Sequence, residues 1–243
     1  MRRSKKHKKK SWFIIFTLLV FVFLSFIIFK VITVDEFIYV NKTEVGDAEI
    51  IGNTFKYKIP ADTKLNSTRG YGEYKISSLW SLSEKDNNGR LVPETIAKNY
   101  FLPVSYWKNK TKSNLNIYQK ISVLFSKKDK NIVSEINSTK LPNSILIQFV
   151  NPEFEEVIPK IEVEDLTNSL NTLNKVSKII EVAGGKITSN SKGYDADLDC
   201  EIYGKKIEII NIFSNIFSCD KKVDTTLTTD LKIRLGAKFS ERF

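Results

Sequence analysis

The stretch Ile161-Glu-Val-Glu-Asp-Leu-Thr-Asn-Ser-Leu170-Asn-Thr-Leu-Asn-Lys-Val-Ser-Lys-Ile-Ile180-Glu-Val-Ala-Gly-Gly185 decides the fold class of the C-terminal part of the chain. Its first three residues predict a short strand. Apolar residues then recur at every third or fourth position, which predicts an amphipathic helix. They are Leu166, Leu170, Leu173, Val176, Ile179, Ile180 and Ala183. Gly184-Gly185 predicts the end of this helix, because glycine readily adopts the left-handed conformation of a C-terminal cap.

The residues after Gly185 continue the alternation of strands and helices. Strands are predicted at 186–189, 200–203 and 230–235, and an amphipathic helix at 206–217. The order β-α-β-β-α-β predicts a small α/β domain. Prolines cluster upstream of it, at Pro142, Pro152 and Pro159, so we place this domain at residues 153–243.

Residues 35–152 predict another α/β domain. Thr54-Phe-Lys-Tyr-Lys-Ile59 alternates polar and apolar side chains with the period of a half-buried strand. Pro60 ends this strand because proline has no N–H for the ladder. Further strands are predicted at 37–40, 49–51 and 144–150, and helices at 74–83, 91–100 and 116–125.

The N-terminus has the pattern of a membrane anchor. A basic tail at residues 1–11 precedes Trp12–Phe29, a run without charge. A bilayer core of about 30 Å requires about 20 apolar residues, and residues 12–34 reach that length if Lys30 extends to the interface. The run is longer than a signal-peptide core and lacks a small-residue cleavage site. We therefore predict one transmembrane signal anchor, with the N-terminus cytoplasmic and the bulk of the chain extracytoplasmic.

The charge balance does not indicate a nucleic-acid partner. The formal net charge is +10, but seven Lys and Arg lie within residues 1–10, and removing them leaves +3 for the other 233 residues. That cluster indicates membrane topology and contact with anionic lipid. The rest of the chain carries no RNP, helix-turn-helix or zinc-finger pattern. The predicted partner is the membrane, through a single span, and not nucleic acid.

Cysteine and histidine usage excludes several kinds of site. The only histidine is His7, so a Cys/His zinc site and a histidine-dependent nucleophilic mechanism are excluded beyond the anchor. Two cysteines, Cys200 and Cys219, are present. In an oxidising compartment they are candidates for a disulfide. Two buried thiols are the alternative.

Four segments of the first predicted domain, taken in order, resemble the LytR-CpsA-Psr family of bacterial cell-envelope proteins. They are Lys58-Ile-Pro-Ala-Asp-Thr63, Gly72-Glu-Tyr-Lys-Ile-Ser-Ser-Leu-Trp80, Leu91-Val-Pro-Glu-Thr-Ile-Ala97 and Leu102-Pro-Val-Ser-Tyr106. The helix before Gly184-Gly185 and the segment Asp230-Leu-Lys-Ile-Arg-Leu-Gly236 resemble the LytR C-terminal domain. A basic tail followed by one membrane helix fits the same architecture.

The resemblance implies transfer of a lipid-linked glycopolymer phosphate to the cell wall. That chemistry needs cations against pyrophosphate oxygens, a role suited to arginine. Where the family reads Ile-Pro-Arg-Asp-Thr, this chain has Ala61, and the segment before it is too short for the family's upstream Arg-x-Asp. The remaining candidate ligand-binding residues are Asp62, Arg69 and Lys75. They also fit a structural interpretation, with Asp62 in a turn or cap and the two cations on a solvated face.

We therefore expect a reduced LytR-CpsA-Psr-like α/β domain and a LytR C-terminal-like domain behind the anchor, in a bacterial cell-envelope protein. The expected function is non-catalytic binding or scaffolding at a wall or surface glycopolymer or at other envelope proteins, without a cofactor or metal. One alternative is a reduced phosphotransferase that uses Asp62, Arg69 and Lys75, with Mg²⁺ held by carboxylate and pyrophosphate. Another is a tethered assembly component of a division or secretion complex.

Overall fold

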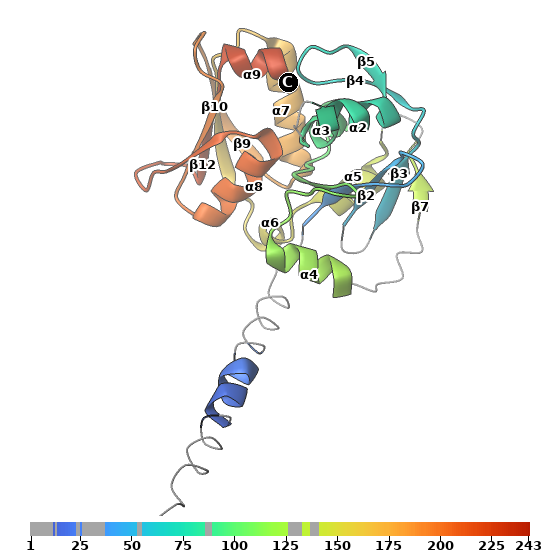
Figure 1. Cartoon of the computed structure of the whole chain (residues 1–243). Coiled ribbons are helices and arrows are strands. Elements are labelled where there is room, and N and C mark those ends of the chain that lie inside the picture. The colour runs from blue at the N-terminus through green and yellow to red at the C-terminus, as the bar shows by residue number, and fades with distance from the viewer. Residues whose placement is uncertain are drawn as a thin grey trace, which may run out of the picture. The chain divides into compact units, whose positions relative to one another are not determined.

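The chain is a mixed α/β protein (Figure 1). The computed structural model describes residues 12, 14–22, 25, 37–52, 55–85, 89–125, 133–136 and 141–243. They belong to two compact units. The first comprises Met1–Asp35 with Leu115–Asp129, and the second comprises Glu36–Asn114 with Lys130–Phe243.

The first unit contains helical residues 14–22 and helix α4 (Ile117–Phe125), which was predicted at 116–125. Asn116 and Gln119 cap α4 reciprocally, because each side-chain oxygen accepts the other's backbone N–H at 2.8 and 2.9 Å. Within the described residues, no helix combines the length and apolarity needed to cross a membrane. The tail at 1–11 and most of the predicted anchor at 12–34 lie outside the described residues.

The second unit begins with a five-stranded sheet whose order is β6-β1-β2-β3-β7. Its strands are β1 (Tyr39–Lys42), β2 (Ala48–Ile51), β3 (Lys56–Ile59), β6 (Tyr106–Lys108) and β7 (Val133–Glu135). The first three pair antiparallel, and β6 and β7 join as parallel edge strands. The three strands predicted before Pro60 therefore form the centre of this sheet.

Two helices and a hairpin complete this half of the unit. They are α2 (Ile76–Lys85), α3 (Leu91–Tyr100), β4 (Lys64–Asn66) and β5 (Glu73–Lys75). Eight of the ten residues of α3 are buried, and Phe101 ends the helix in the left-handed conformation with φ of 58°. This helix was predicted with the same bounds.

A second five-stranded sheet has the order β11-β10-β12-β8-β9. Its strands are β8 (Lys160–Asp165), β9 (Lys186–Lys192), β10 (Cys200–Gly204), β11 (Asp220–Val223) and β12 (Leu231–Leu235), and its helices are α7 (Leu170–Val182), α8 (Ile207–Phe217) and α9 (Ala237–Arg242). Burial alternates along β8, β10 and β12, so one face of this sheet packs against the helices. The predicted β-α-β-β-α-β order is present, with β11 inserted and α9 added.

The ends of α7 show why the sequence forms this helix. The Ser169 side chain caps the N-terminus by accepting the backbone N–H of Thr172. The predicted apolar pattern began earlier, at Leu166, but that residue precedes the cap and its N–H bonds to Leu235 O. Gly184 has φ of +96°, so the predicted left-handed stop is confirmed.

The prediction of a strand at 144–150 is wrong. This segment forms α5 (Asn143–Leu146) and the 3-10 helix η1 (Ile147–Phe149), followed by α6 (Glu153–Glu156). A short apolar run does not by itself distinguish a strand from a helix. Here Ile145, Leu146 and Phe149 share one face and pack on the first core, while Ile147 is exposed.

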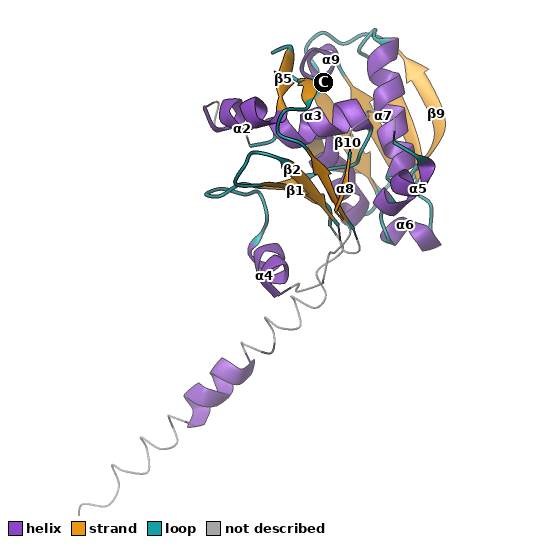
Figure 2. Cartoon of the chain, turned by 90° about the vertical axis from the view of Figure 1, so that its right-hand side faces the viewer, coloured by secondary structure: helices purple, strands orange, loops and turns teal. Residues whose placement is uncertain are grey.

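Two hydrophobic cores meet in this unit. The first lies between the β1–β3 sheet, α2, α3 and η1, and the second between the β8–β12 sheet and its helices. Ala97 of α3 packs in the second core, and Val182 of α7 packs in the first. Figures 1 and 2 show α3 beside α7 where the two halves meet. The division at residues 152 and 153 stays a prediction, since the two halves belong to one compact unit.

Candidate functional site

The three residues predicted to bind a ligand do not lie together. Asp62 is exposed in the turn after β3, and Lys75 is exposed on β5 opposite Lys64. Arg69 lies in the loop that joins β4 to β5, at the other end of this hairpin. Asp62 and Lys75 take part in no ion pair of the described residues, as expected for solvated surface groups.

Arg69 is held in place by a carboxylate. Its Nη2 donates to both oxygens of Glu94, at 3.2 and 3.0 Å, and its Nε is buried without a hydrogen-bond partner. The backbone of Arg69 is left-handed, with φ of 64°, and Gly70 and Gly72 also have positive φ. The two glycines therefore allow the loop to turn back toward α3.

The loop runs antiparallel to α3 and bonds to it at four successive residues. Asn66 exchanges hydrogen bonds with Asn99, and the Ser67 carbonyl accepts from Lys98 Nζ at 2.9 Å. The Thr68 N–H donates to the Thr95 hydroxyl, and Arg69 pairs with Glu94. These contacts order the loop, and they assign Arg69 a structural role.

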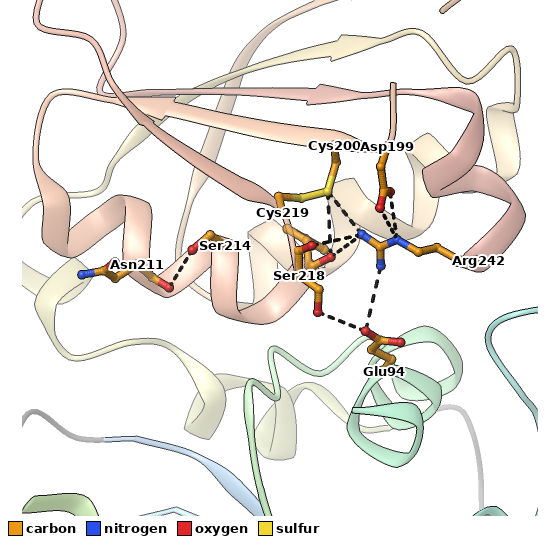
Figure 3. Close-up of a disulfide and its surroundings, with 9 residues drawn as sticks. Glu94, Asp199, Cys200, Asn211, Ser214, Ser218, Cys219 and Arg242 are labelled. Atoms are coloured by element: carbon orange, nitrogen blue, oxygen red, sulfur yellow. Dashed lines mark hydrogen bonds and ion pairs between the residues drawn. A yellow bond between two sulfur atoms is a disulfide. The ribbon is translucent and has the colours of Figure 1, made fainter. Parts of the chain in front are cut away.

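Glu94 lies at the centre of a network that joins the two halves. It is 3% exposed. Besides Arg69, it accepts from the Ser218 hydroxyl at 3.0 Å and lies 3.9 Å from Arg242 Nη1 (Figure 3). The backbone N–H of Arg69 also donates to the Arg242 carbonyl at 2.7 Å. The network therefore connects α3 and its loop to α8 and α9.

Arg242 connects this network to the disulfide. Its Nε donates to both oxygens of Asp199, and its Nη2 donates to the Phe217 carbonyl at 2.9 Å. The same Nη2 lies 3.3 Å from Cys200 Sγ. The predicted disulfide is present, with the Cα atoms of Cys200 and Cys219 4.9 Å apart. It joins the start of β10 to Cys219, the second residue after α8 (Figure 3).

Cations lie four residues before and four residues after Glu94, at Arg90 and Lys98. Burial and, to a smaller extent, the charge of Lys175 on α7 lower the pKa of Lys98. Burial also lowers the pKa of Lys175. At the other end of α3, burial and then the charge of Arg90 lower the pKa of Lys221. We use the name α3 junction for the following residues together: Arg69, Arg90, Glu94, Lys98, Lys175, Lys221 and Arg242.

The outer face of the second sheet is the other charged surface. The charges of its side chains alternate in sign between neighbouring strands, and these side chains form ion pairs with one another. The pairs are Lys222 with Glu201, Glu201 with Arg234, Arg234 with Glu164, and Lys232 with Glu164 and Glu162. The hydrogen bond from Lys222 is the main cause of the lowered pKa of Glu201. The positive and negative charges of this face neutralise one another, so the α3 junction is the stronger candidate for a binding site.

The aromatic residues and the carboxylates add no second candidate. Trp80 is fully buried in the first core. In the part of the chain that the structure describes, no three His, Cys, Asp or Glu side chains are grouped so that they could hold a metal.

Sequence reasoning found Arg69 but missed its partners. The spacing of Arg90, Glu94 and Lys98 was the available signal, because residues four apart share one face of a helix. Lys175 and Arg242 gave no comparable signal. The chain matches no protein-family model, no curated protein and no solved structure.

Proposed function

We propose that this chain is a membrane-anchored, extracytoplasmic protein of the bacterial cell envelope that binds or scaffolds a phosphate-bearing wall or surface polymer without transferring it. In this proposal residues 12–34 are the anchor. Residues 35–152 are a reduced LytR-CpsA-Psr-like domain, and residues 153–243 are a LytR C-terminal-like domain.

The charge of the α3 junction carries the proposal. Besides Arg90, five cations of this junction come from distant parts of the chain: Arg69, Lys98, Lys175, Lys221 and Arg242. Among the described residues, only two carboxylates form ion pairs with them, Glu94 and Asp199. Four of these cations are partly buried and Lys221 is exposed. Partly buried positive charge without an equal number of carboxylates favours an anionic ligand, because burial makes uncompensated charge costly.

The contacts of Arg69 argue for binding rather than transfer. A phosphotransferase needs cations directed at the charge that develops on the transferred phosphate. Arg69 instead directs its guanidinium at buried Glu94, and the hairpin holds Asp62 and Lys75 away from it. The three residues that the enzymatic alternative requires therefore do not converge on one point.

Co-sedimentation of the detergent-solubilised full chain with purified bacterial cell walls tests the proposal. One half of the wall sample is first treated with hydrofluoric acid, which removes phosphodiester-linked polymers. We expect the chain to sediment with untreated walls and to stay in solution with treated walls. Equal sedimentation with both samples, or with neither, contradicts binding to a phosphate-bearing polymer.

A parallel assay tests the absence of catalysis. The full chain is incubated with a polyprenyl-pyrophosphate sugar and Mg²⁺, and release of phosphate or transfer of sugar is measured. We expect no turnover above the protein-free control. Turnover that disappears in Asp62→Ala and in Arg69→Ala would support the phosphotransferase alternative instead.

A further inference from the structure

We infer that Lys98 and Lys175 form a binding site for a phosphate group of the envelope polymer, an inference that rests on the proposed function. The site lies between the C-terminal end of α3 and the middle of α7. Lys175 belongs to the helix before Gly184-Gly185, and Lys98 immediately follows the segment Leu91–Ala97; neither was a candidate site residue in the sequence.

The position of Lys98 is fixed by the loop before β5. Its Nζ donates to the Ser67 carbonyl at 2.9 Å. On either side of this contact, Asn99 and Thr95 hold the loop by further hydrogen bonds. The ammonium group is half-buried and already oriented, so little side-chain entropy would be lost when a ligand binds.

Lys175 brings a second positive charge to the same place from the other half of the unit. It is partly buried on α7 and immediately precedes Val176, which packs in the same core as Ala97, the residue before Lys98. One turn further along α7, the Nζ of Lys178 lies 4.8 Å from the ring centroid of Phe101, the residue that ends α3. Lys178 therefore reaches the C-terminal end of α3, and Lys175 lies one turn before it on α7.

This positive charge is not balanced within the described part of the chain. No carboxylate there lies within ion-pair distance of Lys98, Lys175 or Lys178, whereas Arg69 and Arg242 on the same junction both have one. The C-terminus of α3 contributes about half of a negative elementary charge. That is less than the two charges of Lys98 and Lys175, so an anion from outside would relieve their repulsion.

Phosphate fits this pair better than a carboxylate does. A terminal phosphate carries about −1.5 to −2 charges near neutral pH and offers three acceptor oxygens. Two compact ammonium groups can each donate to a different oxygen of one phosphate, and lysine binds phosphate as a point charge. A single carboxylate would neutralise only one of the two lysines.

The test compares two double variants of the full chain that remove equal charge. Lys98→Met with Lys175→Met changes the proposed site. Lys186→Met with Lys192→Met removes two exposed lysines of the edge strand β9 and serves as the control. Isothermal titration calorimetry measures binding of a poly(glycerol phosphate) chain, of pyrophosphate, and of phosphatidylglycerol vesicles. Thermal unfolding in phosphate-free buffer checks that both variants fold.

We expect the wild type to bind the polymer and pyrophosphate, the site variant to bind both at least about tenfold more weakly, and the control to stay within about twofold. Equal weakening in both variants, or no binding of any probe, overturns the inference. If pyrophosphate alone binds and the site variant loses it, the site stands and the polymer proposal fails. If only the vesicles bind, and the site variant loses that binding, the phosphate belongs to a lipid headgroup. This result likewise contradicts binding of the polymer.

A site variant that unfolds would not leave the inference untested. Lys175→Met alone removes no hydrogen bond that holds the loop, and it relieves a like-charge repulsion. We expect this single variant to fold and to weaken pyrophosphate binding by about tenfold. Unchanged pyrophosphate affinity in a folded Lys175→Met variant would overturn the site.

Discussion

Replacing Glu94 with glutamine tests whether the α3 junction holds the two halves of the unit together. The variant keeps the shape of the side chain and removes its charge. Glu94 is 3% exposed and accepts hydrogen bonds from Arg69 and Ser218. In the variant, the guanidinium of Arg69 would lose its only carboxylate in the described part of the chain.

The size of the effect follows from the burial of the partners. Removing one member of a fully buried ion pair typically costs about 3–5 kcal/mol. The side chains of Arg69 and Arg242 are 29% and 14% exposed, so water can replace part of the lost interaction. A charge-assisted hydrogen bond contributes about 1.5–3 kcal/mol. We therefore expect Glu94→Gln to lower the free energy of unfolding by about 2–3 kcal/mol.

The assay is urea denaturation of the full chain, followed by tryptophan fluorescence. Glu73→Gln is the matched control, because Glu73 and Lys64 form an ion pair at 3.8 Å in which both side chains are 63% exposed. Such exposed pairs contribute about 0–1 kcal/mol. A double-mutant cycle of Glu94→Gln with Arg69→Met should give a coupling energy of at least about 1 kcal/mol. Equal effects of Glu94→Gln and Glu73→Gln would show that Glu94 does not hold the two halves together.

Three further predictions concern the disulfide, an alkaline titration and the membrane topology. Replacing both Cys200 and Cys219 with alanine opens a loop with a sequence separation of 19 and should cost roughly 3 kcal/mol in denaturant unfolding; an unchanged midpoint would show that the bond does not restrict the unfolded chain. Burial raises the pKa of Tyr100 from 10.0 to about 12. The stability that its protonated form contributes is therefore complete below pH 10 and is lost as the pH rises toward 12. The wild type should accordingly lose stability relative to Tyr100→Phe between pH 10 and pH 12. Parallel pH profiles of the free energy of unfolding for the two proteins would contradict the raised pKa. Protease added to intact spheroplasts should degrade residues 36–243; protection of these residues with cleavage of the first ten would show the opposite orientation.

The sequence predicted best those elements that are long and strongly periodic. α3 and α7 carry their own end signals, Pro93 in the first turn of one and Gly184 after the other. The strand β11 was missed because Asp220-Lys-Lys-Val223 is exposed throughout and has no apolar alternation. It is a strand because it pairs with β10, a contact that a local pattern does not reveal. The short helix α9 was missed for the same reason, since Phe239 is its only buried residue.

The candidate site could be predicted only in part. Arg69 was named as a candidate ligand-binding residue, but its partner Glu94 lies 25 residues away. Ser218, which bonds to the same carboxylate, is 124 residues from Glu94. One sequence carries no signal for such pairs, because their proximity depends on how the two sheets pack. When those partners are not known, the sequence does not distinguish a structural arginine from a ligand-binding one.

Equilibrium dialysis of the full chain against a phosphate-bearing wall polymer tests whether the chain binds such a polymer without changing it. The polymer is recovered after dialysis and its length and phosphate content are measured. We expect saturable binding that weakens as the ionic strength rises, because salt screens the lysine charges. We also expect the recovered polymer to be unchanged. Absence of saturable binding would contradict a binding function, and a shortened or dephosphorylated polymer would contradict a non-catalytic one.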